Sequence, residues 1–393
     1  MNHLSFGKIL FTLVLYVLVV SSTSLGQQPS FSIEVVDNQI EIGYGVAIGD
    51  VDGDGKPDIL LADKKEIVWY KNPGQRNRTW QRYVIAANLT EYDNVCIAAR
   101  DLDGDGKVEV AVGAQWNPAE TNDRDKSGAV FYLKRPADPT QQWAPVRLHH
   151  EVTIHRMQWG RKPDGNYQLL VLPLHGQGNV NGTGEGVKWI AFDVPKNPDG
   201  EWTYQLLDTQ LHMTHNFQVL EEEGKSLTAA VGGREGVKLL HYKNGKWEDP
   251  GEWLVKDKPV GEVQIGTFRS GKSFIATIEP MHGTHVMLTG EDGNRTELSS
   301  NFVQGHAVGV ADLLGTGSDQ VVAGWRNPNK DRMVGVRLYV EKESTWEEHI
   351  LDNSVRMACE DLKIADLDGD GKLDVIAAGR ATLNVLIYWN NTK

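Results

Sequence analysis

The sequence predicts an all-β chain folded as a seven-bladed β-propeller with four strands in each blade. A stretch of alternating apolar residues followed by an acidic, glycine-rich turn occurs seven times, at intervals of roughly 40 to 65 residues, which is typical of propeller blades. Further strand-like segments follow each turn. The last repeat lacks its fourth strand, and an unassigned strand precedes the first repeat. A chain of 393 residues is long for one domain, but repeated β-strands form single units of this size.

Each repeat begins with a predicted inner strand and its turn. These segments lie at 43–55, 94–106, 152–165, 215–224, 262–271, 305–317 and 360–371. In the first repeat, the next three strands are predicted at 58–62, 66–70 and 80–85. The fourth strand often opens with a tryptophan, as at Trp80, Trp202 and Trp346. Each repeat therefore supplies one blade.

The two ends of the chain are predicted to share the last blade. The final repeat stops after a third strand at 383–389, whereas 31–36 matches the pattern of a fourth strand. Pairing of these segments would close the ring and remove its exposed edges. A two-sheet sandwich or two smaller domains is the alternative, but no linker rich in Pro, Ser or Gly divides residues 27–393.

The first 26 residues resemble an export signal. Lys8 precedes an apolar run at 9–20, and small residues lead to a cleavage point near Gly26. We therefore expect a secreted or periplasmic protein without a membrane span in its mature part, the alternative being an uncleaved anchor. Cys96 and Cys359, the two cysteines, fall in non-neighbouring blades, so we expect two buried free thiols. The net charge of −13 disfavours nucleic acid as a partner.

Three acidic turns have the spacing of calcium ligands. They lie at 50–58, 101–109 and 366–374, with carboxylates at positions 1, 3, 5 and 9 and a backbone carbonyl at position 7. The predicted ligands are the side chains of Asp50, Asp52, Asp54, Asp58, Asp101, Asp103, Asp105, Glu109, Asp366, Asp368, Asp370 and Asp374, and the carbonyls of Lys56, Lys107 and Lys372. Glycines at positions 4 and 6 allow the turn. Turns without metal are the alternative, and the decayed turn at 312–319 is not expected to bind an ion.

These Asp-x-Asp-Gly-Asp-Gly turns resemble those of the FG-GAP and VCBS repeat propellers, over essentially the whole mature chain. The resemblance implies that Ca²⁺ occupies the hairpin between the first two strands of a blade, on the face opposite the ligand site. Calcium would then stabilise the fold and take no part in chemistry.

The opposite face is predicted from the residues that begin each inner strand and those that follow each second strand. Because the inner strands converge on the axis of a propeller, side chains distant in sequence meet there. The candidate catalytic residues are His155, Arg156, His175, His215, His282 and His306, and the candidate substrate-binding residues are Tyr44, Trp116, Arg234, Trp325, Arg326 and Arg380.

Two chemistries suit this set. His215 and His306, with Glu262 or Glu360, can hold a second divalent metal, such as Mg²⁺, Mn²⁺ or Zn²⁺, that polarises a carbonyl. His155 can act as a general base. The arginines would neutralise an anion, and Trp116 and Trp325 would stack on a sugar ring. For any one histidine, a structural role is the alternative.

The segment 151–159, with His155 and Arg156 at its centre, resembles the third blade of the aldos-2-ulose dehydratase propeller, and the contexts of His175 and His306 are compatible with it. The resemblance implies elimination of water from a keto sugar with a histidine base and a bound metal. No cupin domain follows the last repeat, so an isomerase step tied to such domains is not expected.

Three functions remain open. The favoured one is a secreted carbon–oxygen lyase that acts on oxidised sugars or their glycosides by proton abstraction and β-elimination. The alternative is a non-catalytic, calcium-stabilised propeller that binds a glycan or a protein through the face opposite the acidic turns. A hydrolase of similar shape is the third, although a Gly-x-Ser-x-Gly elbow, a phosphate loop and a zinc-protease helix are all absent from the sequence.

Overall fold

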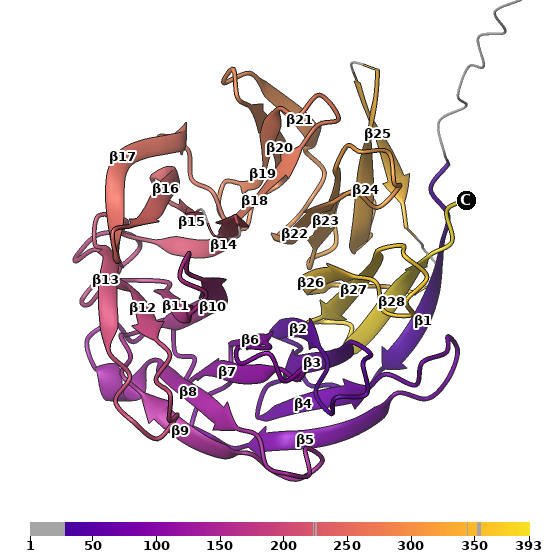
Figure 1. Cartoon of the computed structure of the whole chain (residues 1–393). Helices are drawn as coiled ribbons and strands as arrows, with labels where there is room; N and C mark the ends of the chain where they lie inside the picture. Colours follow the sequence, from indigo (N-terminus) through magenta and orange to yellow (C-terminus); the bar gives the residue numbers. More distant parts are fainter. Residues whose placement is uncertain (1–27, 223, 225, 344, 352–354) are drawn as a thin grey trace, which may run out of the picture.

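A computed structural model describes residues 28–393 except 223, 225, 344 and 352–354. The predicted export signal at 1–26 lies outside the described residues. The described residues form seven four-stranded sheets, and all strand pairs in them are antiparallel. Figure 1 shows the sheets arranged around one axis. This arrangement confirms the seven-bladed propeller. Among the described residues, no helix has the length and apolar character needed to cross a membrane.

Each blade runs outward from the axis in chain order. The inner strands of blades 1 to 7 are β2 (Gly45–Gly49), β6 (Cys96–Arg100), β10 (Ile154–Arg161), β14 (Thr214–Glu222), β18 (Glu262–Thr267), β22 (Gly305–Ala311) and β26 (Cys359–Ala365). The second strands are β3 (Asp58–Ala62), β7 (Glu109–Ala114), β11 (Tyr167–Pro173), β15 (Ser226–Gly233), β19 (Ser273–Glu279), β23 (Gln320–Trp325) and β27 (Asp374–Gly379).

The outer half of each blade completes the sheet. The third strands are β4 (Glu66–Lys71), β8 (Ala129–Lys134), β12 (Trp189–Asp193), β16 (Gly236–Lys243), β20 (His285–Gly290), β24 (Gly335–Lys342) and β28 (Asn384–Asn390). The fourth strands are β5 (Gln81–Ala87), β9 (Ala144–Leu148), β13 (Tyr204–Asp208), β17 (Lys246–Lys256), β21 (Arg295–Ser299), β25 (Thr345–Ile350) and β1 (Phe31–Asp37). A short 3-10 helix, η1 (Arg124–Lys126), interrupts the loop before β8.

The N-terminal strand closes the ring, as predicted. β1 pairs with β28 in the register Ile33↔Tyr388, so the last blade combines both ends of the chain. The buried carboxylate of Glu34 on β1 accepts hydrogen bonds from the indole Nε1 of Trp389 at 2.8 Å and of Trp80 at 3.2 Å. Trp80 belongs to blade 1, so one side chain joins the first and last blades.

The core lies between the blades. Seven clusters of buried apolar side chains each combine residues of two neighbouring blades. The tryptophans before the fourth strands take part in this packing: Trp202 of blade 3 lies 5.3 Å, between ring centroids, from Tyr132 of blade 2. Its Nε1 donates to the carbonyl of Pro198 at 3.0 Å, so β13 begins two residues later than the prediction at Trp202.

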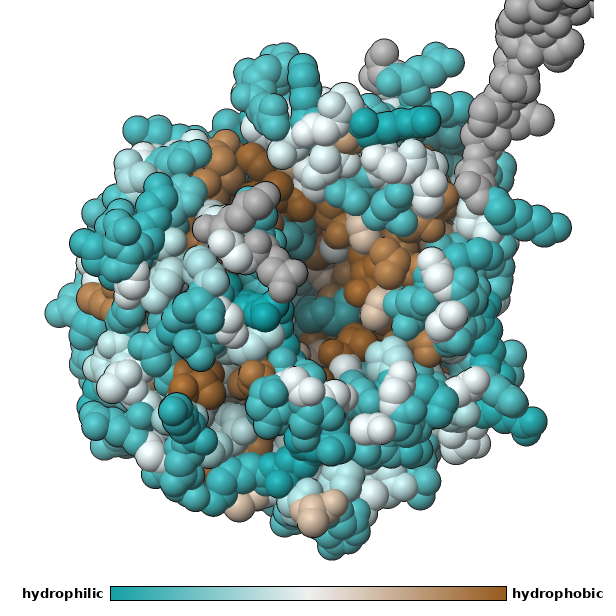
Figure 2. All heavy atoms as spheres, in the orientation of Figure 1, coloured by the Kyte–Doolittle hydropathy of each residue, from teal (hydrophilic) through white to brown (hydrophobic). Residues whose placement is uncertain are grey.

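A polar channel of about 440 Å³ runs along the axis between the inner strands, and it opens at the centre of the surface in Figure 2. Inner strands of neighbouring blades belong to separate sheets, so their channel-facing N–H groups need other acceptors. Side chains supply them: Gln218 of blade 4 accepts from the N–H of Ile265 in blade 5, and Asp361 of blade 7 accepts from the N–H of Val46 in blade 1 at 2.8 Å.

Both cysteines are free and buried, in agreement with the prediction. Cys96 lies in blade 2 and Cys359 in blade 7, at the first residue of their inner strands. Burial raises the pKa of the Cys96 thiol to about 12, so it carries no thiolate at neutral pH.

Candidate active site

The predicted axial residues lie at the beginnings of the inner strands. His155, His215, His306 and Glu360 are each the second residue of their strand, and Glu262 is the first of β18. The acidic turns follow the opposite ends of inner strands. The residues at the beginnings of the inner strands are therefore separated from the acidic turns by the length of a strand, as the sequence predicted.

Three histidines from three blades form a compact cluster. One ring nitrogen from each of His215, His282 and His306 lies within 4.8 Å of the others. The Nε2 atoms of His215 and His282 contact each other, and the ring centroids of His282 and His306 are 4.7 Å apart. His282 follows β19, whereas the sequence proposed His215 and His306 as metal ligands and His282 as a catalytic residue. The structure thus adds a third imidazole to the predicted ligand pair.

Oxygen atoms orient two of these imidazoles from behind. Nδ1 of His215 lies 2.8 Å from Oε1 of Glu262, although neither atom makes an aligned hydrogen bond within the described chain. Nδ1 of His306 donates to the backbone carbonyl of Glu360 at 2.6 Å. Such contacts are typical of metal-binding histidines, because they direct the other ring nitrogen toward the ion. The donor set of imidazoles and carboxylates therefore fits a divalent metal, and three imidazoles favour Zn²⁺ over Mg²⁺.

His155 lies beside this cluster and has a defined tautomer. Its Nδ1 is 2.9 Å from the carbonyl of His215 and must therefore carry the proton. Its Nε2 accepts a hydrogen bond from Nη1 of Arg156 at 3.0 Å, and its ring stacks on Trp116 with centroids 5.0 Å apart. The free electron pair of Nε2 is thus available to a substrate only after Arg156 releases it.

The buried histidines are held neutral. Burial, followed by the positive charge of Arg156, lowers the pKa of His155 and of His215 well below the usual value. Burial also lowers the pKa of His282 to about 2, with His215 and Arg326 adding to the effect. For Glu262, burial raises the pKa of the carboxyl. Neutral imidazoles are the form that binds metals and accepts protons.

Two arginines surround Glu360. Nη1 of Arg326 lies 3.0 Å from Oε2 of Glu360, and Nη1 of Arg380 lies 3.0 Å from Oε1. Nη2 of Arg326 donates to the amide oxygen of Gln304 at 2.7 Å and lies 3.5 Å from Nδ1 of His282. Gln304 was not among the predicted site residues. Its position immediately before an inner strand is the signal that would have identified it.

One predicted contact is wrong. Trp325 cannot stack on a sugar, because its side chain is 1% exposed and packs on Phe302 with ring centroids 4.5 Å apart. Its Nε1 donates to the carbonyl of Met333, which holds the ring in the core. The alternation of side chains along β23 turns this residue inward and leaves Arg326, the next residue, on the site.

Three other predicted residues have separate surroundings. Tyr44 is buried, and its hydroxyl lies 3.2 Å from Asp93 while Arg380 covers its ring at 5.2 Å. Arg234 donates to the carbonyl of Asn181. Within the described chain no contact joins the imidazole of His175 to the three-histidine cluster, and its Nδ1 is buried without a hydrogen-bond partner. Roles for these residues stay predictions.

The three acidic turns share one geometry. In each, the carboxylates of positions 1, 3 and 9 lie together, with one oxygen from each within 4.8 Å of the others: Asp50, Asp52 and Asp58; Asp101, Asp103 and Glu109; Asp366, Asp368 and Asp374. The N–H groups of Gly53 and Gly55 donate to Asp50 at 2.7 Å, with φ values of 80° and 82° that require glycine. An all-oxygen set of this kind fits a hard cation such as Ca²⁺.

The carboxylate at position 5 lies outside the group that the other three form, and its role as a ligand stays a prediction. The carboxylate of Asp54 accepts from the backbone N–H and the ammonium of Lys56, at 3.1 and 3.0 Å, and it shares the ammonium of Lys71 with Asp52. Asp105 likewise binds the backbone N–H of Lys107 at 2.8 Å. The Asx-type turn satisfies these carboxylates locally, and so three side chains, rather than four, form each cluster.

The fold and its repeats define a seven-bladed propeller of the FG-GAP type. A model described as FG-GAP-like repeat matches residues 50–112, and one described as FG-GAP repeat matches 97–133. A third, "Aldos-2-ulose dehydratase, beta-propeller domain", matches residues 127–290, so this part of the chain is related to that propeller domain. The match includes His155, Arg156, His215, Glu262 and His282. No curated protein sequence matches the chain significantly.

Solved structures share the fold at low sequence identity. BBS1N, in its complex with ARL6DN, is 14% identical, with a TM-score of 0.57 over 92% of this chain and 96% of that one. The extracellular domain of BT4673 from B. thetaiotaomicron is 11% identical, with a TM-score of 0.50 over 92% of this chain and 40% of that one.

Proposed function

We propose that this protein is a carbon–oxygen lyase that eliminates water or an alcohol from keto sugars or their glycosides at the propeller axis. The observation that carries the proposal is the cluster of His215, His282 and His306, with Glu262 behind it and His155 beside it. The relation of residues 127–290 to the aldos-2-ulose dehydratase propeller supports the same chemistry.

The three histidines, backed by Glu262 and Glu360, would hold a divalent metal, which supplies Lewis-acid polarisation of a substrate carbonyl. Nε2 of His155 would take the proton from the carbon beside that carbonyl. The electrons of the broken C–H bond form a C=C bond, and the β-oxygen would leave as water or alcohol by taking up the proton that Nε2 of His155 has accepted. Arg326 and Arg380 would stabilise the negative charge that develops on the sugar.

We also propose that the three acidic turns bind Ca²⁺ and stabilise their hairpins. Each turn places three carboxylates within 4.8 Å on the end of the propeller opposite the histidine cluster. A cation would relieve the repulsion among them. The ions would act on stability alone. The apolar run after Lys8 supports export, and calcium is abundant outside the cell.

The lyase is tested by incubating the Zn²⁺-loaded protein with a panel of 2-keto and 3-keto sugars and their methyl glycosides. Elimination creates a C=C bond conjugated to the carbonyl, so absorbance in the ultraviolet should rise. The variant His155→Ala should lose this product, whereas His241→Ala, which alters a histidine outside the cluster, should retain it. Full activity of His155→Ala would remove the proposed base, and absence of product from every sugar would contradict the lyase.

A binding propeller is the second candidate. The contact of Arg156 with Nε2 of His155 favours it, because this contact occupies the only nitrogen of His155 that could accept a proton. Measurable affinity for an oligosaccharide without any product would support this candidate.

A further inference from the structure

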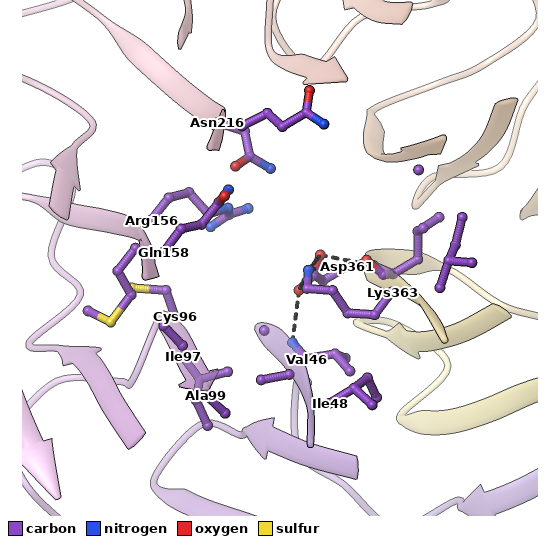
Figure 3. A pocket seen from close by; sticks show the side chains of 18 of the residues that line it. Val46, Ile48, Cys96, Ile97, Ala99, Arg156, Gln158, Asn216, Asp361 and Lys363 are labelled. Carbon is purple, nitrogen blue, oxygen red and sulfur yellow. Dashed lines mark hydrogen bonds and ion pairs between the residues drawn. The ribbon is translucent and has the colours of Figure 1, made fainter. Parts of the chain in front are cut away.

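Arg156 differs from the other basic side chains of the channel. Arg100 makes two hydrogen bonds to Glu221, at 2.6 and 2.8 Å, and Lys363 lies 3.0 Å from both carboxylate oxygens of Asp361. Arg156 lines the same channel, yet no carboxylate of the described chain lies within ion-pair distance of its guanidinium. Figure 3 shows Arg156 on the side of the channel opposite Asp361 and Lys363. It is therefore a channel cation without an ion pair among the described residues, and Glu262, the carboxylate whose burial-raised pKa its charge offsets in part, is already bound by Asn216.

The guanidinium also retains free donors. Nη1 contacts the Nε2 and the carbonyl oxygen of His155, both at 3.0 Å. Within the described residues, Nε and Nη2 have no hydrogen-bond partner. The two neighbouring amides do not supply such free donors, because both already make hydrogen bonds. Asn216 donates to Glu262 at 2.7 Å, and Gln158 binds the backbone of β14 through both its amide atoms. A half-buried, unpaired guanidinium is costly unless an anion reaches it, and its planar fork matches a carboxylate.

We propose that Arg156 binds a carboxylate of the substrate, which makes the substrate a keto sugar acid. This inference rests on the proposed function, because it places the sugar beside the histidine cluster. The channel volume of about 440 Å³ lies in the range of roughly 300–1,000 Å³ that is usual for small-molecule sites. Two further arginines at the site, Arg326 and Arg380, share the single carboxylate of Glu360, so the surroundings favour an anion.

Binding of the acid would also activate the base. The carboxylate competes with Nε2 of His155 for the N–H groups of Arg156. When the guanidinium turns to the carboxylate, the electron pair of Nε2 becomes free to accept a proton. Arg156 would thus couple recognition of the acid to the ability of His155 to accept a proton.

The test compares 2-keto-D-gluconate with D-fructose, which differ only in carrying a carboxylate or a hydroxymethyl group at C1. Binding to the purified chain is measured by calorimetry. We expect the acid to bind at least about tenfold more tightly than the neutral sugar. The variant Arg156→Gln should lower the affinity for the acid by about 10- to 100-fold and leave the affinity for D-fructose unchanged. Arg100→Gln, which removes a paired cation of the same channel, should alter neither.

Equal affinity for the two sugars, no binding of 2-keto-D-gluconate, or an equal loss for both in Arg156→Gln would overturn the inference. Product formation is scored separately. Selective loss of acid binding without any elimination by the unmodified protein would support the inference and contradict the lyase. Elimination from neutral keto sugars, with no preference for the acid, would support the lyase and contradict the inference.

Discussion

Nδ1 of His215 lies 2.8 Å from Oε1 of Glu262, and both side chains are buried. We expect Glu262→Gln to lower the affinity of the axial metal by about 10- to 100-fold, because this carboxylate orients a ligand imidazole. Metal content after dialysis against graded chelator, determined by mass spectrometry, measures the change. Glu252→Gln is the matched control, since Glu252 pairs with an outlying histidine, His241, at 3.5 Å. Equal metal retention in both variants would contradict a metal role for His215.

The calcium proposal is tested by comparing an intact acidic turn with the decayed turn at 312–319. Asp366 accepts from the N–H groups of Gly369 and Gly371, at 2.8 and 2.9 Å, and Asp312 makes the same kind of contacts in the decayed turn. Asp366→Asn should reduce bound calcium from about three ions per chain to about two and lower the melting temperature in calcium. Asp312→Asn should leave the calcium content unchanged. Calcium binding and melting are measured with and without chelator, and an unchanged stoichiometry in Asp366→Asn would count against the site.

Ring closure depends on Glu34. Its carboxylate accepts from two indoles and from the backbone N–H of Asn77 at 2.7 Å, so Glu34→Ala leaves these donors without a partner. We expect a loss of about 2–3 kcal/mol in the free energy of unfolding, measured by urea denaturation. Glu41→Ala, which removes an exposed ion pair with Lys64, should change it by less than about 1 kcal/mol. Similar effects of the two variants would show that Glu34 does not secure the closing strand.

Acid should destabilise the protein in part through His150. This residue is buried, and burial lowers its pKa below the usual 6.5, with Arg147, Arg124 and His149 contributing positive charge. Since the unfolded chain binds the proton more readily, the contribution of His150 is present above pH 6.5 and is lost as the pH falls. Between pH 7.5 and 5.5, the unfolding free energy of the unmodified protein should therefore fall more than that of His150→Gln. Parallel pH profiles would contradict this.

Much of the fold could be predicted because its signals are local. An inner strand and its acidic turn recur with little change in most repeats, and β3 has the bounds that the sequence predicted, 58–62. The start of β13 could not be predicted as well, because an indole-to-carbonyl contact holds Trp202 in the preceding loop. The carboxylates at positions 1, 3 and 9 come together because of the turn itself, whereas the orientation of Asp54 depends on contacts with Lys56.

The sequence by itself determined the number of blades, the closing strand and the separation of the acidic turns from the axial residues, because each of these follows from a short repeated pattern. Only the tertiary structure decided which axial residues meet. His282 joins His215 and His306 because the blades converge, Trp325 turns into the core while Arg326 faces the site, and Arg156 is left without the carboxylate that Arg100 and Lys363 each have. Such pairings depend on distances between blades, and the spacing of residues along one chain does not contain them.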